Sequence, residues 1–154
     1  MQTLSDHILD IAQNSIRAQA SRVEIDLQEN ITEDSLVITI RDNGCGMDET
    51  TVAKVTDPFF TSRTVRKVGL GIPLFKQNAE ATGGTLKIKS KPGKGTTIEA
   101  NFGLSHWDSP PMGDIAGSIV ILVSANPGID FIYRHSTEKG KYTFDTNEVK
   151  EILE

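Results

Sequence analysis

The spacing of apolar residues changes near residue 21, and this change limits the folds open to the chain. Before it, apolar side chains recur every three or four positions up to about Ala20, which is the period of one helix face. These side chains are Leu4, Ile8, Ile11, Ala12 and Ile16. After it, apolar and polar residues alternate over 23–27 and, beyond a polar turn at 29–35, again over 37–40. We therefore expect a helix, capped by Ser5 or Asp6, and then two antiparallel strands.

Glycines mark the next boundaries. The segment Asp42-Asn43-Gly44-Cys45-Gly46 ends the second strand, because glycine supplies the positive φ of a tight loop, and 48–55 predicts a short helix. A pair of glycines at 69 and 71 precedes a helix to about Thr82, in whose first turn Pro73 loses no hydrogen bond. Between these boundaries, 56–68 has no sustained period and carries three positive charges, which predicts a mobile lid.

A hairpin and an appendix complete the prediction. Residues 85–90 and 96–102 alternate around the turn at 91–95, the pattern of a β-hairpin. After a Pro-containing connector, Asp114 can cap a helix that ends at Asn126-Pro127-Gly128, although a strand also fits this β-branched stretch. Two more strands, at 130–135 and 141–146, and a short helix from Asn147 follow. We expect a domain over 1–103 and an appendix over 104–154 that packs on this domain or on a partner.

Composition excludes several classes of protein. The 154 residues, 37% hydrophobic and 24% charged, suit a globular domain with a real core, and the net charge of −5 argues against duplex DNA as a partner. The longest apolar run, 119–123, is too short to span a membrane, and the first ten residues lack a basic start followed by an apolar core, so no membrane or export targeting is expected. One cysteine, Cys45, and three scattered histidines offer neither a disulfide nor a metal cluster, so a reducing cytoplasm is expected.

Asp10 and Asn14 lie four residues apart, on one face of the first predicted helix. An amide oxygen is a suitable ligand for Mg²⁺, and a neighbouring carboxylate could orient a water aimed at a phosphate. A solvated polar face would give the same pair of residues.

Asp42 follows a predicted strand and precedes Gly44 and Gly46. A carboxylate accepts hydrogen bonds only, so it suits the exocyclic amino group of adenine, while the glycines let the backbone approach the base. An Asp-capped turn is the alternative. Cys45 is interpreted as a small space-filling residue.

Two further signals are weaker. Gly69 and Gly71 precede a helix, and the free N–H groups of a helix N-terminus bind phosphates. Thr96 follows Gly93-Lys94-Gly95, where its hydroxyl could bond the adenine edge, although a plain hairpin turn explains it equally. Each motif alone is thus also explained by a globular domain that binds no nucleotide and has incidental glycine turns.

Taken together, the motifs resemble the GHKL superfamily of histidine kinases, gyrases and heat-shock chaperones. The resemblance covers residues 5–102 and consists of DIAQN, RDNGCGM, DPFFTSR, VGLGI and GKGT in this order. It implies an α/β (α+β) two-layer sandwich, with helices on one face of a mixed, mostly antiparallel sheet and ATP held under a lid. By resemblance, the ATP-binding residues are Asn14, Asp42, Gly44, Gly46, Phe59, Phe60, Arg63, Lys67, Gly69, Leu70, Gly71 and Thr96. Asn14 would also bind Mg²⁺.

Departures from the family pattern bear on function. Gyrase-like and chaperone-like ATPases carry a glutamate, as general base, where this chain has Asp10. In the family, the second glycine-rich motif, here VGLGI, commonly begins with a further glycine, and this chain has Lys67 in its place. We expect no phospho-accepting histidine helix before the Asn14 motif, and His7 is interpreted as a cap-region or surface residue.

Three functions follow from the resemblance. The spellings PFFTSR and VGLGI favour a kinase-like catalytic subunit that phosphorylates a separate protein in signal transduction. An ATPase that uses Asp10 as base, with a homodimer as one possible form, is the second, and an ATP-gated, anti-sigma-like binding module for a regulator is the third. No nucleic-acid or membrane partner is expected.

Overall fold

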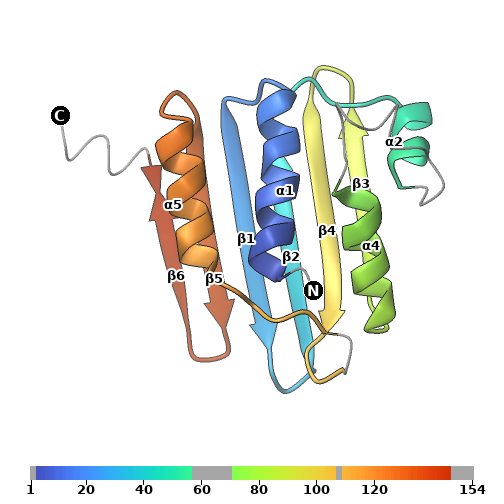
Figure 1. Ribbon diagram of the computed structural model, residues 1–154, viewed down its shortest axis with the longest axis vertical. Helices are drawn as coiled ribbons and strands as arrows, with labels where there is room; N and C mark the ends of the chain where they lie inside the picture. Colours follow the sequence, from blue (N-terminus) through green and yellow to red (C-terminus); the bar gives the residue numbers. More distant parts are fainter. Residues whose placement is uncertain (1–2, 57–70, 107–108, 147–154) are drawn as a thin grey trace.

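The computed structural model describes residues 3–56, 71–106 and 109–146, which form two layers (Figure 1). One layer is a six-stranded sheet and the other consists of helices on one of its faces. The helices are α1 (Leu4–Arg17), α2 (Glu49–Val55), α4 (Ile72–Ala81) and α5 (Ile115–Ala125). The strands are β1 (Arg22–Asn30), β2 (Ser35–Asp42), β3 (Thr85–Lys91), β4 (Gly95–Gly103), β5 (Asp130–Thr137) and β6 (Gly140–Asp145). The predicted two-layer sandwich is confirmed.

The sheet has the strand order β3-β4-β2-β1-β5-β6. Neighbours are antiparallel except β1 and β5, which are parallel, so the sheet is mixed and mostly antiparallel as predicted. In this register Asp42 of β2 lies opposite Thr96 of β4, and Thr96 lies opposite Ser90 of β3. Three polar side chains from three strands therefore share one row at one end of the sheet, and Asp42 lies far in sequence from the other two.

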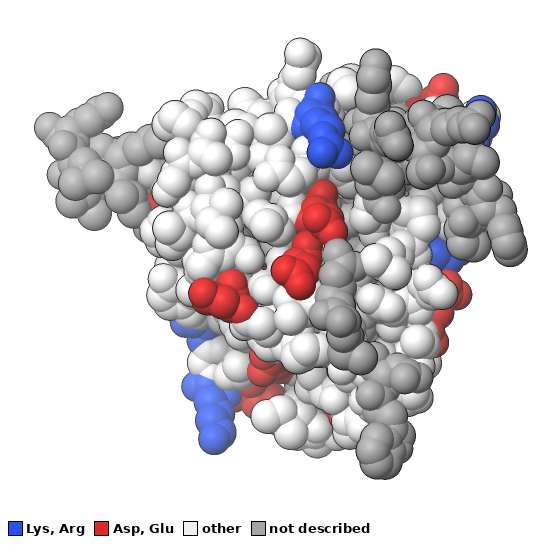
Figure 2. Space-filling model, viewed as in Figure 1, with Lys and Arg blue, Asp and Glu red and all other residues white. Residues whose placement is uncertain are grey.

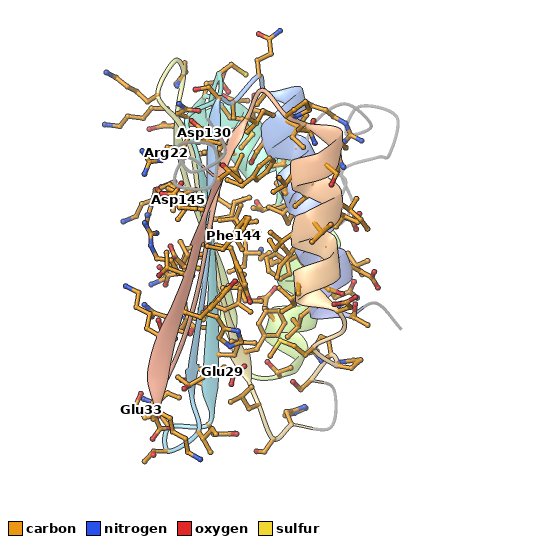
Figure 3. All side chains as sticks on the ribbon, turned by 90° about the vertical axis from the view of Figure 1, so that its left-hand side faces the viewer. Arg22, Glu29, Glu33, Asp130, Phe144 and Asp145 are labelled. Carbon is orange, nitrogen blue, oxygen red and sulfur yellow. The ribbon has the colours of Figure 1, made fainter. Side chains whose placement is uncertain are left out.

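The two faces of the sheet differ in burial. Val23, Ile25 and Leu27 of β1 are fully buried beneath the helix layer, because successive side chains of a strand point to opposite faces. Their neighbours Glu24 and Asp26 point to the other face, which no helix of the described residues covers (Figure 3). One face thus supplies the core, and the other is polar.

The start of α1 differs from the prediction. Its cap is Thr3, whose hydroxyl accepts from the Asp6 N–H at 3.1 Å, while the Asp6 carboxylate accepts from the Thr3 N–H at 3.0 Å. The connector that follows β4 supplies two more acceptors, since the N–H groups of Leu4 and Ser5 donate to the carbonyls of Pro111 and Met112 at 2.9 and 3.0 Å. The connector thereby completes the N-terminus of α1.

Residues 115–146 extend the same sheet and helix layer. The segment after Asp114 is a helix and not a strand, and the Asp114 carboxylate caps it by accepting from the Gly117 N–H at 2.9 Å. β5 then pairs along β1, and the Glu138 carboxylate in the β5–β6 turn accepts from the Thr32 N–H at 3.0 Å. The appendix is therefore bonded to both ends of β1.

No helix among the described residues is long and apolar enough to cross a membrane.

Candidate functional site

Asp42 ends β2 with its carboxylate held in one orientation. Ser15 of α1 donates its hydroxyl proton to one carboxylate oxygen at 2.6 Å, and the Gly44 N–H donates to the other at 2.9 Å. Ser15 is only 3% exposed, so this contact is shielded from water. Each carboxylate oxygen can accept a further hydrogen bond, which makes Asp42 a positioned acceptor for an amino group.

Thr96 lies beside this carboxylate in a small hydroxyl network. Its Oγ1 is 2.8 Å from Ser90 Oγ, which accepts from the Met47 N–H at 2.8 Å and donates to the Gly95 carbonyl at 3.0 Å. The loop that carries Met47 is thus tied to the β3–β4 hairpin. Asp42 and Thr96, both predicted as site residues, are brought together as register partners.

Two glycines make this close approach possible. Gly46 and Gly95 have φ of +71° and +113°, and a Cβ atom built on either would lie 2.0 Å from a backbone carbonyl oxygen, that of Lys91 and that of Asp42 respectively. No other residue type could replace either glycine without moving the backbone. The loop, the hairpin turn and the end of β2 therefore pack backbone to backbone.

The loop also contacts the end of α1. The Cys45 N–H donates to the Ala18 carbonyl at 2.9 Å, and a Cβ on Gly44 would lie 2.8 Å from the Ala18 Cβ. Cys45 itself is exposed, so its interpretation as a space-filling residue is wrong. The backbone of the loop, and not the thiol, makes the contact.

Asp10 and Asn14 lie one turn apart on one face of α1. Asp10 is exposed, and a Cβ built on Gly71 would lie 2.9 Å from the Asp10 Cβ, so the start of α4 passes directly against it. Asn14 is half-buried, and its side-chain oxygen accepts from Arg17 at 3.4 Å. The structure thus brings two predicted site residues, Asp10 and Gly71, together, and Asn14 lies one turn further along α1.

His7 is neither a cap nor a surface residue, contrary to the prediction. Its side chain is fully buried, its Nε2 lies 2.7 Å from the Asn78 side-chain nitrogen of α4, and its ring lies 5.0 Å from that of Phe75. Burial lowers the pKa of His7 below its ordinary value, although the carboxylates of Asp10 and Asp6 oppose this shift. A neutral His7 accepting from Asn78 joins α1 to α4 one turn from Asp10.

Six predicted site residues lie outside the described residues. They are Phe59, Phe60, Arg63, Lys67, Gly69 and Leu70. The predicted lid and the short helix expected from Asn147 also fall largely outside the described residues, so both stay predictions.

Sequence reasoning missed Ser15 and Ser90. Ser15 lies four residues after Ile11 and is buried, whereas Ile16, predicted in the apolar stripe, is only partly buried. A serine on the buried face of a helix needs a polar partner, and this signal could have pointed to Asp42. For Ser90, the alternation within β3 indicated the face of the sheet to which the side chain points. It could not show that the Met47 N–H donates a hydrogen bond to the Ser90 hydroxyl there.

The model of the family described as "Histidine kinase-, DNA gyrase B-, and HSP90-like ATPase" matches residues 2–106. This chain belongs to that family. The matched segment includes Asp10, Asn14, Asp42, Gly71 and Thr96. The chain is thus an ATP-binding domain of the histidine-kinase-like type.

Several relatives are sensor kinases. The chain is 34% identical over 96 residues to the signal transduction histidine-protein kinase AtoS of Escherichia coli, and the match covers 62% of this chain and 16% of AtoS. It is 37% identical over 94 residues to the sensor protein kinase FleS of Pseudomonas aeruginosa, covering 61% of this chain and 23% of FleS. The match therefore spans less than a quarter of either kinase.

A solved structure supports the fold. The ATPase domain of MutL from Aquifex aeolicus, complexed with ADP, superposes with a TM-score of 0.57 at 15% identity, covering 99% of this chain and 69% of that domain. At this identity the likeness concerns the fold alone.

Proposed function

We propose that this chain binds Mg-ATP on the helix-covered face of its sheet, at the end that carries Asp42 and Thr96. It then transfers the γ-phosphate to a separate protein in signal transduction. One observation carries the proposal: Asp42 is oriented by Ser15 and Gly44 beside Thr96. A fixed acceptor next to a hydroxyl suits the exocyclic amino group and ring edge of adenine. The similarity to sensor kinases supports transfer to a protein in preference to other uses of ATP.

The remaining residues have distinct roles in this proposal. The start of α4 at Gly71 offers backbone N–H groups and the positive end of the helix dipole to the phosphates. Asn14 would hold Mg²⁺ through its amide oxygen, and Mg²⁺ would neutralise charge on the phosphate oxygens. Residues 1–103 would form the nucleotide-binding part and 104–154 an appendix supporting it.

A second function is favoured by the position of Asp10. Its carboxylate is exposed and lies against Gly71, where it could orient a water for hydrolysis of ATP. Asp10→Asn keeps the size of the side chain and removes its basicity. A hydrolase would lose phosphate release in this variant, whereas a kinase that uses Asp10 only for positioning would retain transfer.

The first experiment is calorimetric titration of the protein with ATP and ADP, with and without Mg²⁺. We expect saturable, Mg²⁺-dependent binding that Asp42→Asn abolishes, because the amide presents a donor to the adenine amino group. A folded wild-type protein that binds no nucleotide would contradict the proposal.

The second experiment separates transfer from hydrolysis. The protein is incubated with γ-labelled ATP, alone and with a cell extract, and both free phosphate and acid-labile protein label are measured. Label on added protein supports the kinase, free phosphate alone supports the ATPase, and binding with neither supports a nucleotide-gated module for a regulator.

A further inference from the structure

A cavity of about 800 Å³ opens at the same end of the sheet. Its lining includes one complete row across four strands, formed by Lys89, Thr97, Arg41 and Glu24, which are register partners in this order. Each of these residues alternates with a side chain of the helix-covered face, so the row points to the uncovered face of the sheet. A substantial part of the cavity wall is therefore the uncovered face, opposite to α1.

Other elements complete the wall. Helix α2 contributes Glu49, Val52 and Ala53, the end of β3 contributes Lys91, and the β3–β4 turn contributes Lys94. Asp42 and Thr96 also line the cavity, which places it against the strands that carry the nucleotide site. Figure 2 shows the helix side, where Lys and Arg are sparse. Among the described residues, the helix side thus shows few basic side chains in this view, whereas the cavity lining contains several.

The charges of this lining are unequal. Five of the lining residues are cationic, and they are Arg22, Arg41, Lys89, Lys91 and Lys94. The acidic ones are Glu24, Asp42 and Glu49.

Two of the three acidic residues have partners among the described residues. Glu24 pairs with Arg22 and Arg41 at 3.5 Å each and with Arg134 at 3.2 Å, and Asp42 is held by Ser15 and Gly44. Among the described residues, the exposed lysines Lys89, Lys91 and Lys94 form no salt bridge. A chain with a net charge of −5 therefore carries a local excess of positive charge here.

Lysines on an edge strand often only discourage pairing with another sheet. That role suits Lys89 and Lys91 of β3, the outermost strand on this side of the described sheet. It does not explain Lys94, which lies in a turn, or Arg41, which lies on the interior strand β2. The arrangement extends from the edge to the middle of the sheet, as a binding surface would.

We propose that this basic cavity binds an acidic segment of a partner protein. Charge complementarity supplies attraction and orientation, and the apolar side chains of Val52 and Ala53 supply contact for the segment. Asp10, Asn14 and Gly71 lie outside this lining, whereas Asp42 and Thr96 belong to it, so the segment would bind next to the nucleotide site and share part of its wall. The inference goes beyond ATP binding and does not depend on it.

The test uses a fluorescent deca-glutamate peptide at about 0.15 M salt, where long-range attraction between exposed charges is screened. Its affinity for the full chain is measured by fluorescence anisotropy. Lys89→Ala with Lys91→Ala should weaken binding about tenfold, because two charges leave the cavity. The matched control is Lys139→Ala with Lys141→Ala, which removes the same charge from two exposed lysines outside the cavity and should change affinity less than twofold.

Three results would overturn the inference. They are no saturable peptide binding by the wild type, equal losses in the two double variants, and binding of inorganic tripolyphosphate without binding of the peptide. ATP titration of the same variants separates this proposal from the previous one, since neither pair of lysines belongs to the nucleotide site. If the Lys89→Ala, Lys91→Ala variant keeps its ATP affinity and loses its peptide affinity, the result supports peptide binding in the cavity without bearing on the nucleotide proposal.

Discussion

The nucleotide end of the sheet and the unit α5–β5–β6 are held together in different ways. At the nucleotide end, side-chain hydrogen bonds converge on Asp42 and Thr96, and Gly46 and Gly95 leave no room for a Cβ atom. In the other unit, a Cβ on Gly128 or Gly140 would meet nothing within 4 Å.

Apolar burial holds the α5–β5–β6 unit in place. Leu122 and Phe131 are almost completely buried, and β5 adds backbone pairing along β1. Buried apolar contacts tolerate many combinations of side chains, whereas converging polar contacts do not. The difference explains why the first region carries recognisable motifs and the second carries none.

The largest expected effect tests the tight backbone packing. Gly95→Ala should lower the free energy of unfolding by about 3–5 kcal/mol, since its φ is unfavourable for alanine and its Cβ would overlap the Asp42 carbonyl. Gly93→Ala is the control, because Gly93 also has positive φ but open space around it, and should cost about 1 kcal/mol. Urea unfolding measures both. If Gly95→Ala and Gly93→Ala have equal free energies of unfolding, the β3–β4 hairpin can shift and the nucleotide end of the sheet is not tightly constrained.

The second prediction tests whether the C-terminal unit serves stability only. Leu122→Ala, at a fully buried position of α5, should lower the free energy of unfolding by about 3 kcal/mol, because it leaves a cavity. The neighbouring Ile121, 55% exposed, should cost less than about 1 kcal/mol on replacement by alanine. ATP affinity of the folded fraction, measured by calorimetry, should be unchanged in both. A change in affinity would mean that the two regions are coupled.

Ser15→Ala should separate affinity from stability at the nucleotide end. The variant removes the 2.6 Å hydrogen bond to Asp42 and should weaken ATP binding about fivefold to tenfold, equivalent to about 1–1.4 kcal/mol. Ser5→Ala is the matched control, since Ser5 is also a buried serine of α1 but lies at the opposite end of the helix. It should leave ATP affinity within about twofold, because its hydroxyl makes no contact with the site. Equal affinities for the two variants would exclude Ser15 as a positioning residue.

The smallest effect concerns the contact between His7 and Asn78. Because burial lowers the pKa of His7, the unfolded chain binds more protons than the folded one below the ordinary value of 6.5. The free energy of unfolding should therefore fall as pH falls below about 6.5, and should be independent of His7 above it. Urea unfolding at about pH 7.5 and pH 5.5 should show a smaller loss for His7→Gln than for the wild type. His106→Gln, at an exposed position, serves as the control and should match the wild type.

Local periodicity was enough to predict most elements. The helix spacing of α1, the alternation of β1 and β2, and the glycine-marked turns correctly located the helices and strands, because these patterns are determined by neighbours in sequence. The resemblance then grouped Asp42 with Thr96. The parallel pairing of β1 with β5 could not be predicted, since it depends on contacts between segments about 100 residues apart.

The errors in the site prediction also arise because a side chain's surroundings depend on segments distant in sequence. His7 lies three residues after Leu4 and four before Ile11, hence on the buried face, but only the position of α4 shows what covers it. Cys45 was assigned to the interior although the loop turns its side chain outward. The sequence identifies which residues carry chemistry more readily than which partners hold them.

The central position of β1 has a consequence during synthesis on the ribosome. β1 and β2 emerge early, but the second neighbour of β1 is β5, which ends at Thr137, more than 100 residues after β1 ends at Asn30. At roughly 5–20 residues per second, one edge of β1 remains unpaired for about 5–20 seconds. An exposed apolar strand edge is a template for wrong pairing. The nascent chain therefore passes through an aggregation-prone stage that ends only when β5 is complete.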